Sequence, residues 1–352
     1  MMMSRALPLA LLAAAATAAS PQPPPWSWST LPVFHHAAKT IGDYDAAQLA
    51  ALARYPLVVI EKFQAISAPQ DNRTEEERIL AACRGVKALS ASTACIFYLN
   101  SVISFPQYAY AQVLRDTRSD LWLRDDGGVP INMSGPGWPA HVPPYPVLDY
   151  AQPAARAFFV AACTGAVASG VVDGCFLDRE VDVGASFAAR LPADKVAAWA
   201  AGHAAMATEL QAALGAGTVI ANHMTSASAL IPGVRGCMFE ALNFSESSLA
   251  GLLWAAEAGL VCEVHVEPEC NVKTLALFLL TVEPSLYYGC GGWDSATGMN
   301  VRPNFFDYPL GAPLGPLANA SGILSREFAS GTQVEVDFGN GTATVRWAKR
   351  SV

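Results

Sequence analysis

The chain has 352 residues, of which 52% are hydrophobic and 15% are charged, so it can bury one large core or two medium ones. Its formal net charge of -8 argues against nucleic acid as the main partner, because phosphate binding requires clustered Lys and Arg. The composition therefore favours a globular protein that acts on something other than nucleic acid.

The first residues have the pattern of a secretory signal peptide. Arg5 precedes an apolar run over residues 6–16, and small residues follow up to Ala19. The run is too short to span a bilayer, and no later segment is long and apolar enough to do so. We therefore expect a signal peptide at residues 1–19, a Pro-rich leader at 20–31, and a secreted protein without a membrane span.

Eight cysteines follow the predicted cleavage site, an even number that suits disulfides in an oxidising compartment. The sequence leaves their pairing open. Cys262 and Cys270 are close enough to staple one loop, while buried free thiols at Cys95, Cys175 and Cys237 are an equally weighted alternative. Five Asn-x-Ser/Thr sites predict surface glycosylation if the source is eukaryotic: Asn72, Asn132, Asn243, Asn319 and Asn340.

Eight short apolar runs predict β-strands along the chain, and helical patterns separate most of them. The runs lie near residues 33, 58, 96, 175, 219, 237, 262 and 286. Such alternation predicts a parallel β/α architecture, and eight units fit a closed (β/α)8 TIM barrel over residues 32–310. An open doubly wound sheet is the alternative, but the Gly-rich nucleotide loop that usually follows its first strand is missing.

The C-terminal segment has a different pattern. Residues 333–338 and 343–347 alternate apolar with polar side chains, and Gly339-Asn340-Gly341 joins them. This pattern predicts a β-hairpin. We expect residues 311–352 to form a small β extension packed on the barrel.

Polar groups end nearly every predicted strand. Glu61, Asp178 and Glu240 each follow an apolar run, and so do Asn100, Asn222, His223 and Trp293. In a β/α barrel the chemistry lies at the carboxyl ends of the strands. Two carboxylates at that end are what glycoside hydrolysis requires.

Several short motifs connect the chain to a known family: Tyr98-Leu-Asn100-Ser101, Asp173-Gly174, Phe176-Leu177-Asp178, Phe239-Glu240 and Arg326-Glu327-Phe328. With them the chain resembles, from about residue 33 to 347, a family of hypothetical TIM-barrel glycoside hydrolases distantly related to polygalactosaminidase-like barrels. The resemblance implies a barrel that acts on a glycan, with an Asp after the fourth strand and an acid after the sixth. Asp178 and Glu240 hold those positions.

We assign roles to these residues accordingly. Asp178 is the expected nucleophile or general base, and Glu240 is the expected general acid. For the second role the pKa of Glu240 must be raised, which the apolar Met238 and Phe239 and a nearby carboxylate would do. The expected substrate-binding side chains are Glu61, Asn100, Asn222, His223, Trp293 and His35.

Two alternatives remain open. The stretch Asp173 to Glu180 resembles the signature of chitinase-like barrels, in which the last Glu is the acid, although Phe176 stands where that signature has an Asp. Asp178 and Glu180 would then be the catalytic pair. The other alternative is a carbohydrate-binding barrel without catalysis. No spacing of His and Cys predicts a metal site, and we expect no cofactor; the expected partner is an oligo- or polysaccharide.

Overall fold

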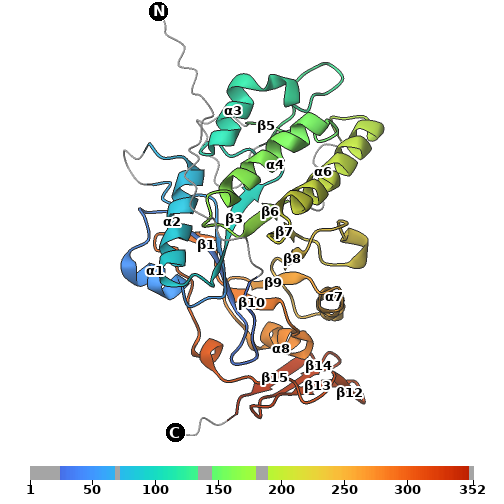
Figure 1. Ribbon diagram of the computed structural model, residues 1–352. Coiled ribbons are helices and arrows are strands. Elements are labelled where there is room, and N and C mark those ends of the chain that lie inside the picture. The colour runs from blue at the N-terminus through green and yellow to red at the C-terminus, as the bar shows by residue number, and fades with distance from the viewer. Residues whose placement is uncertain (1–23, 68–71, 134–144, 180–188, 349–352) are drawn as a thin grey trace, which may run out of the picture.

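The computed structural model describes residues 24–67, 72–133, 145–179 and 189–348 (Figure 1). The predicted signal peptide, residues 20–23 of the leader, and Glu180 lie outside the described residues.

Eight parallel strands form the centre of the molecule. In chain order they are β1 (Phe34–Lys39), β2 (Leu57–Ile60), β3 (Ala94–Asn100), β6 (Gly174–Asp178), β7 (Thr218–Asn222), β8 (Gly236–Phe239), β9 (Val261–Val266) and β10 (Leu286–Cys290). Each pairs in parallel with the next, and a parallel bridge from Val33 to Tyr288 joins the first strand to the last. The predicted barrel is confirmed. A short ninth strand of this sheet, β11 (Asp294–Ser295), pairs in parallel with the carboxyl end of β1.

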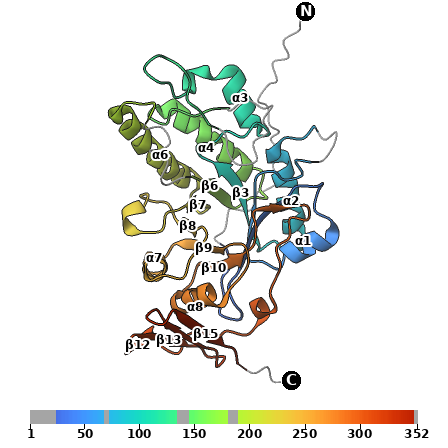
Figure 2. The same ribbon diagram turned by 180° about the vertical axis from the view of Figure 1, so that it is seen from behind.

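Helices surround the barrel (Figures 1 and 2): α1 (Ala46–Leu52), α2 (Glu75–Leu89), α3 (Ala109–Thr117), α4 (Pro153–Val167), α6 (Ala193–Leu214), α7 (Glu246–Glu257) and α8 (Val272–Thr281). Capping boxes begin α1 at Asp45 and α2 at Thr74. In each, the side chain accepts a hydrogen bond from the backbone N–H three residues later, and the side chain of that later residue bonds back to the first N–H. The connection from β7 to β8 differs, since it holds only the 3-10 turn η2 (Ala227–Ala229). Alternation is therefore less strict than the sequence pattern indicates.

Small elements lie between the barrel units. The long connection from β3 to β6 contains η1 (Ser119–Leu121) and the short antiparallel pair β4 (Asn132–Met133) and β5 (Tyr145–Pro146). After β11 the chain forms η3 (Asn304–Asp307).

The C-terminal segment forms a four-stranded antiparallel sheet against α8. The predicted hairpin is confirmed as β14 (Gln333–Asp337) and β15 (Thr342–Arg346), and β12 (Ala318–Ala320) and β13 (Ile323–Glu327) extend it. Val334 and Val336 are buried because one face of β14 packs on the helix. Arg326 fixes the contact, since its Nη1 donates to the carbonyl of Val282 at 2.8 Å.

Three disulfides connect barrel elements. Cys83–Cys95 ties α2 to β3, Cys163–Cys175 ties α4 to β6, and Cys270–Cys290 joins the segment after β9 to the end of β10. The Cys262–Cys270 staple is thus wrong, because Cys262 lies buried near the start of β9 and Cys270 lies beyond its carboxyl end.

The free-thiol alternative holds for only one of its three cysteines. Cys95 and Cys175 are disulfide-bonded, whereas Cys237 is a buried thiol directly opposite Cys262 on the neighbouring strand.

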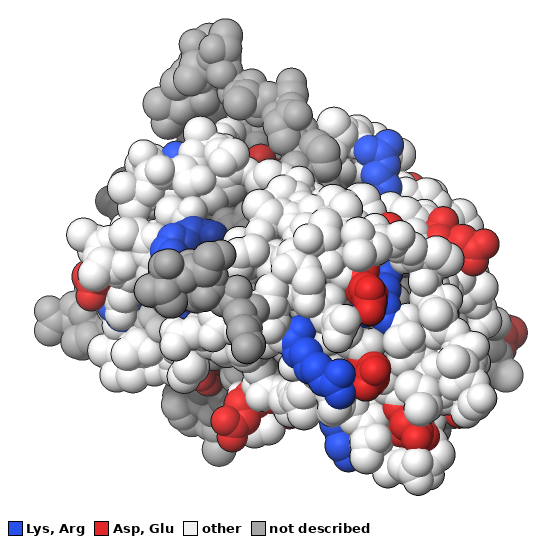
Figure 3. All heavy atoms as spheres, turned by 90° about the horizontal axis from the view of Figure 1, so that it is seen from below, with Lys and Arg blue, Asp and Glu red and all other residues white. Residues whose placement is uncertain are grey.

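The outer surface carries no dominant charge on the face seen in Figure 3, where basic and acidic side chains are scattered among uncharged ones. Among the described residues, no helix has the length and apolar character to cross a membrane.

Candidate active site

Three neighbouring strands deliver the central polar side chains to one end of the barrel. Asp178 and Asn222 are the last residues of β6 and β7, and Glu240 directly follows β8. The next residue along the chain has a positive φ in all three cases: 59° at Arg179, 62° at His223 and 53° at Ala241. Such left-handed backbone is uncommon outside glycine and clusters at functional sites. The chain therefore turns sharply after each polar side chain at the barrel mouth.

Hydrogen bonds hold the Asp178 carboxylate from two sides. Its Oδ2 accepts from the Tyr98 hydroxyl at 2.5 Å and from Asn100 Nδ2 at 2.7 Å. Its Oδ1 accepts from Asn222 Nδ2 at 3.0 Å and from the backbone N–H of Arg179 at 2.8 Å. Two donors on each oxygen fix the carboxylate in one orientation, as a reacting group requires.

Asn222 joins the two predicted catalytic carboxylates. Its Nδ2 donates both to Asp178 Oδ1 at 3.0 Å and to Glu240 Oε2 at 2.7 Å. The sum of these distances, 5.7 Å, is the greatest possible separation of the two oxygens. The structure therefore places both carboxylates in one cluster at the mouth.

Glu240 is held in its charged form. His223 Nε2 lies 3.1 Å from its Oε2. This contact, followed by the Asn222 hydrogen bond, lowers the pKa of Glu240 to about 2, although partial burial acts in the opposite direction. The expectation of a raised pKa is wrong. Alternation along the strand directs Phe239 to the other face from Glu240, whereas His223 approaches from the neighbouring strand end.

Comparison with known proteins identifies the family. A profile of hypothetical glycosyl hydrolase family 15 matches residues 87–332, which include both carboxylates. The chain belongs to this glycosyl hydrolase family. No curated protein sequence matches it.

Two solved structures of glycoside hydrolases share the barrel fold. A GH31 family sulfoquinovosidase from E. rectale has a TM-score of 0.51 and 13% identity, over 80% of this chain and 45% of that one. A cycloalternan-degrading enzyme from Trueperella pyogenes has a TM-score of 0.50 and 14% identity, over 76% of this chain and 44% of that one. The glycoside hydrolase domain of PelA from Pseudomonas aeruginosa has a TM-score of 0.41 and 14% identity, over 68% of this chain and 83% of that one.

Trp293 and His265 form a stacked pair of rings near the carboxyl ends of β9 and β10 in this glycosyl hydrolase. Trp293 lies between β10 and β11, and its ring stacks on His265 with centroids 3.9 Å apart. Glu267 follows β9, and its pKa is raised mainly by burial and further by the charge of Glu240. His265 and Glu267 are absent from the sequence-based assignment, although their spacing of two residues at a strand end places them on one face.

Lys62 and Glu61 form a second pair of ionisable groups at the mouth. Lys62 Nζ lies 2.7 and 3.0 Å from the two Glu61 oxygens and 4.7 Å from the centroid of the Tyr98 ring. Burial raises the pKa of Glu61 to about 8, against the attraction of Lys62. The Lys62 ammonium also interacts with the charge of Asp178. The predicted Glu61 therefore belongs to the site, together with a lysine that the sequence-based assignment omits.

Tyr98 is another residue that the assignment omits. Tyr98 and Asn100 lie two apart on β3, so both point into the barrel and reach the same Asp178 oxygen. Asn100 is predicted to bind sugar hydroxyls, but its Oδ1 accepts from the backbone N–H of Val102 and Ile103. Its amide is thus engaged at both ends and supports Asp178 instead.

His35 is not part of this cluster. Its Nε2 lies 3.0 Å from the Gly298 carbonyl oxygen, and burial lowers its pKa to about 4. Alternation along β1 turns His35 outward and His36 inward, so the sugar-binding role of His35 stays a prediction without support from this cluster.

His36 lies beneath the mouth, with its Nδ1 3.2 Å from Glu263 Oε2. Burial raises the pKa of Glu263 and lowers that of His36 well beyond their usual ranges, so this interior pair is uncharged. Among the described residues, no group of three His, Cys, Asp or Glu side chains is arranged to hold a metal ion.

Proposed function

We propose that this protein is a secreted glycoside hydrolase that cleaves O-glycosidic bonds with retention of anomeric configuration. Asp178 acts as the nucleophile and Glu240 as the general acid and base. Three disulfides support export to an oxidising compartment. The predicted signal peptide agrees with this, although it lies outside the described residues.

The bridge through Asn222 carries the proposal. Retaining enzymes hold their carboxyl groups about 5–5.5 Å apart, whereas inverting enzymes leave about 6.5–9.5 Å for a water molecule. The oxygens of Asp178 and Glu240 that share Asn222 are at most 5.7 Å apart. This spacing favours direct attack by a carboxylate over attack by an interposed water.

In the first step, an Asp178 oxygen forms a bond to the anomeric carbon, and the bond from that carbon to the leaving-group oxygen breaks. The leaving oxygen receives a proton from Glu240. Because Glu240 is ionised in the free protein, we place this proton on His223 before the reaction. It passes to Glu240 across their 3.1 Å contact as the leaving oxygen approaches.

In the second step, Glu240 removes a proton from water, and the water oxygen bonds to the anomeric carbon. The ester bond to Asp178 breaks, and the carboxylate is restored. The hydrogen bonds from Tyr98 and Asn100 stabilise the departing charge. The product has the anomeric configuration of the substrate.

Neighbouring groups are placed to bind the sugar. The half-buried Trp293 ring lies beside Glu267, which feels the charge of Glu240, and aromatic faces suit the C–H surfaces of sugar rings. Glu61 and Lys62 supply an acceptor and a donor for hydroxyl groups on the Asp178 side.

The test is hydrolysis of a broad panel of glycans and aryl glycosides by the wild type, Asp178→Asn and Glu240→Gln. Glu209→Gln on α6 is the matched control, because its side chain is 45% exposed and its carboxylate pairs with Arg156 on α4. We expect cleavage by the wild type and the control, a loss of about 10²–10⁴-fold in Glu240→Gln, and a loss at least as large in Asp178→Asn.

Glycan binding without cleavage, unchanged in both variants, would instead identify a carbohydrate-binding barrel. Full activity in Glu240→Gln would contradict its role as the acid and favour the alternative in which Glu180 is the acid.

A further inference from the structure

A cavity lies at the opposite end of the barrel from the carboxylates. Its walls include residues 53–56, directly before β2, and residues 90–93, directly before β3. Residues 25–27 and 30–33 close it from the N-terminal side, and Arg302 closes it from the C-terminal side. The cavity has a volume of about 280 Å³, close to the lower end of the range for small-molecule sites.

One wall of this cavity is basic. Arg54 and Arg302 both bind Asp307, at 2.8 Å and 2.7 Å, so two guanidinium groups share a single carboxylate. Arg302 is also held in place over the Tyr55 ring, with its guanidinium carbon 4.6 Å from the ring centroid. No Asp or Glu lines the cavity among the described residues. The cavity therefore has a positive charge surplus in a protein whose net charge is -8.

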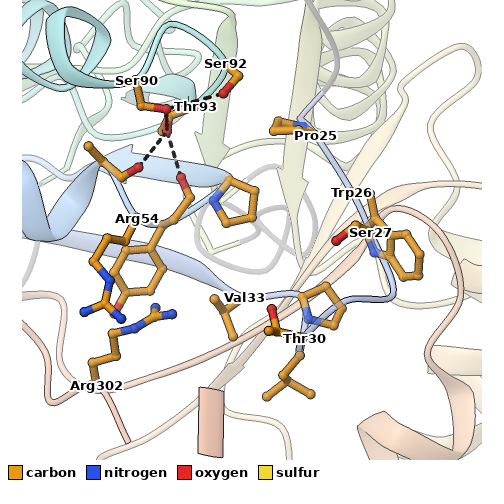
Figure 4. A pocket seen from close by; sticks show the side chains of 15 residues that line it. Pro25, Trp26, Ser27, Thr30, Val33, Arg54, Ser90, Ser92, Thr93 and Arg302 are labelled. Atoms are coloured by element: carbon orange, nitrogen blue, oxygen red, sulfur yellow. Dashed lines mark hydrogen bonds between the residues drawn. The ribbon is translucent and has the colours of Figure 1, made fainter. Parts of the chain in front are cut away.

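The other walls supply an aromatic ring and hydroxyl groups. Figure 4 shows Trp26 across the cavity from the two arginines, with Ser90, Ser92 and Thr93 above Arg54. Trp26 is fixed, because its Nε1 donates to the Leu286 carbonyl at 3.1 Å. Its ring also packs edge-on against Trp28, with ring centroids 4.4 Å apart. Ser92 is exposed, so its hydroxyl remains accessible to a ligand.

We infer that this cavity binds an acidic sugar unit of a polysaccharide, bearing a carboxylate or a sulfate ester. Guanidinium groups match the planar oxygens of such anions, and the indole face suits the body of a sugar ring. The choice of a sugar rests on the proposed function, whereas the choice of an anion rests on the arginines. A site at the far end of the barrel holds a polymer without entering the mouth, so it raises the local concentration of substrate.

The experiment is calorimetric titration of the Asp178→Asn protein, which removes hydrolysis, with trigalacturonate, a sulfated trisaccharide and neutral maltotriose. We expect one or both acidic ligands to bind at least tenfold more tightly than maltotriose, and to bind more weakly at high salt. Adding Arg54→Gln, whose side chain is 55% exposed, weakens binding about tenfold or more. Adding Ser92→Trp fills the cavity and abolishes binding.

Arg346→Gln is the matched control, since this exposed arginine lies on β15 and should leave binding unchanged. Binding that survives both Arg54→Gln and Ser92→Trp would overturn the inference, and so would a failure of both acidic ligands to bind. Displacement by inorganic sulfate at the same concentration would overturn the sugar assignment. Hydrolysis by the wild type is measured separately, so a failed hydrolysis with intact binding contradicts only the proposed function.

Discussion

Asp178 and Glu240 accept hydrogen bonds from one and the same amide nitrogen, at 3.0 Å and 2.7 Å. The nitrogen belongs to Asn222, on the strand between theirs. Two carboxylates that would otherwise repel each other are thereby fixed side by side. The shared donor sets their spacing, and it adds to the larger effect of His223 in keeping Glu240 ionised.

Asn222→Ala tests the role of this bridge. Loss of the amide removes one of the contacts that lower the pKa of Glu240, so this pKa rises from about 2. Loss of a donor aimed at the reacting carboxylates should reduce kcat by about 10²–10³-fold. Steady-state kinetics and a carboxyl NMR titration measure both effects. Asn243→Ala, in the exposed loop after β8, is the control. An unchanged kcat in Asn222→Ala would contradict a catalytic role for the Asn222 bridge.

Tyr98→Phe tests the support of Asp178. The hydroxyl donates to Asp178 Oδ2 at 2.5 Å, and a hydrogen bond to a charged group is worth about 1.5–3 kcal/mol. We expect kcat to fall about 10–100-fold with the ring and its contact to Lys62 preserved.

Tyr108→Phe is the matched control for that variant. Its buried hydroxyl donates to the Tyr98 carbonyl at 3.1 Å and makes no contact with Asp178. Thermal unfolding measured on both variants separates a loss of stability from a loss of rate. Equal effects of the two substitutions on kcat would show that Tyr98 acts only through packing.

His223→Gln tests the origin of the transferred proton. In the wild type we place the transferred proton on His223, whose Nε2 lies 3.1 Å from Glu240 Oε2. Without the imidazole the largest contact that lowers the pKa of Glu240 is gone, and that pKa rises from about 2. Glu240 must then carry the proton alone, and carboxyl groups in general lose their proton at a lower pH than imidazoles. The basic limb of the pH profile of kcat/KM should therefore move to lower pH; a basic limb that does not move contradicts this route.

The cysteine connectivity gives a prediction that is independent of activity. Non-reducing peptide mapping should recover Cys83–Cys95, Cys163–Cys175 and Cys270–Cys290. Thiol alkylation of the denatured protein should label two cysteines, Cys237 and Cys262. A peptide that links Cys262 to Cys270 would contradict the arrangement of β9.

The barrel was predictable because its signals are local. Each strand is a short apolar run, and a polar residue marks the end of several of them, as at Asp178 and Glu240. Parallel strands bring such ends together whatever lies between them, so the cluster at the mouth follows from the fold.

The electrostatics of the site were not predictable in the same way. Met238 and Phe239 precede Glu240 and suggest an apolar environment, but the contacts that set its pKa come from β7. The roles of Asn222 and Tyr98 depend likewise on which side chain reaches which oxygen across neighbouring strands. Register and side-chain direction determine these contacts, and neither is encoded in one strand.

The most direct test of the catalytic assignment is covalent trapping. The 2-deoxy-2-fluoro derivative of the sugar identified by the hydrolysis panel, with an activated leaving group, is incubated with the wild-type protein. Intact mass and peptide mapping then locate the label. The account predicts one fluorosugar per protein, attached to Asp178, because the fluorine slows release of the ester. A label on another residue, or turnover without a label and with an inverted product, would contradict it.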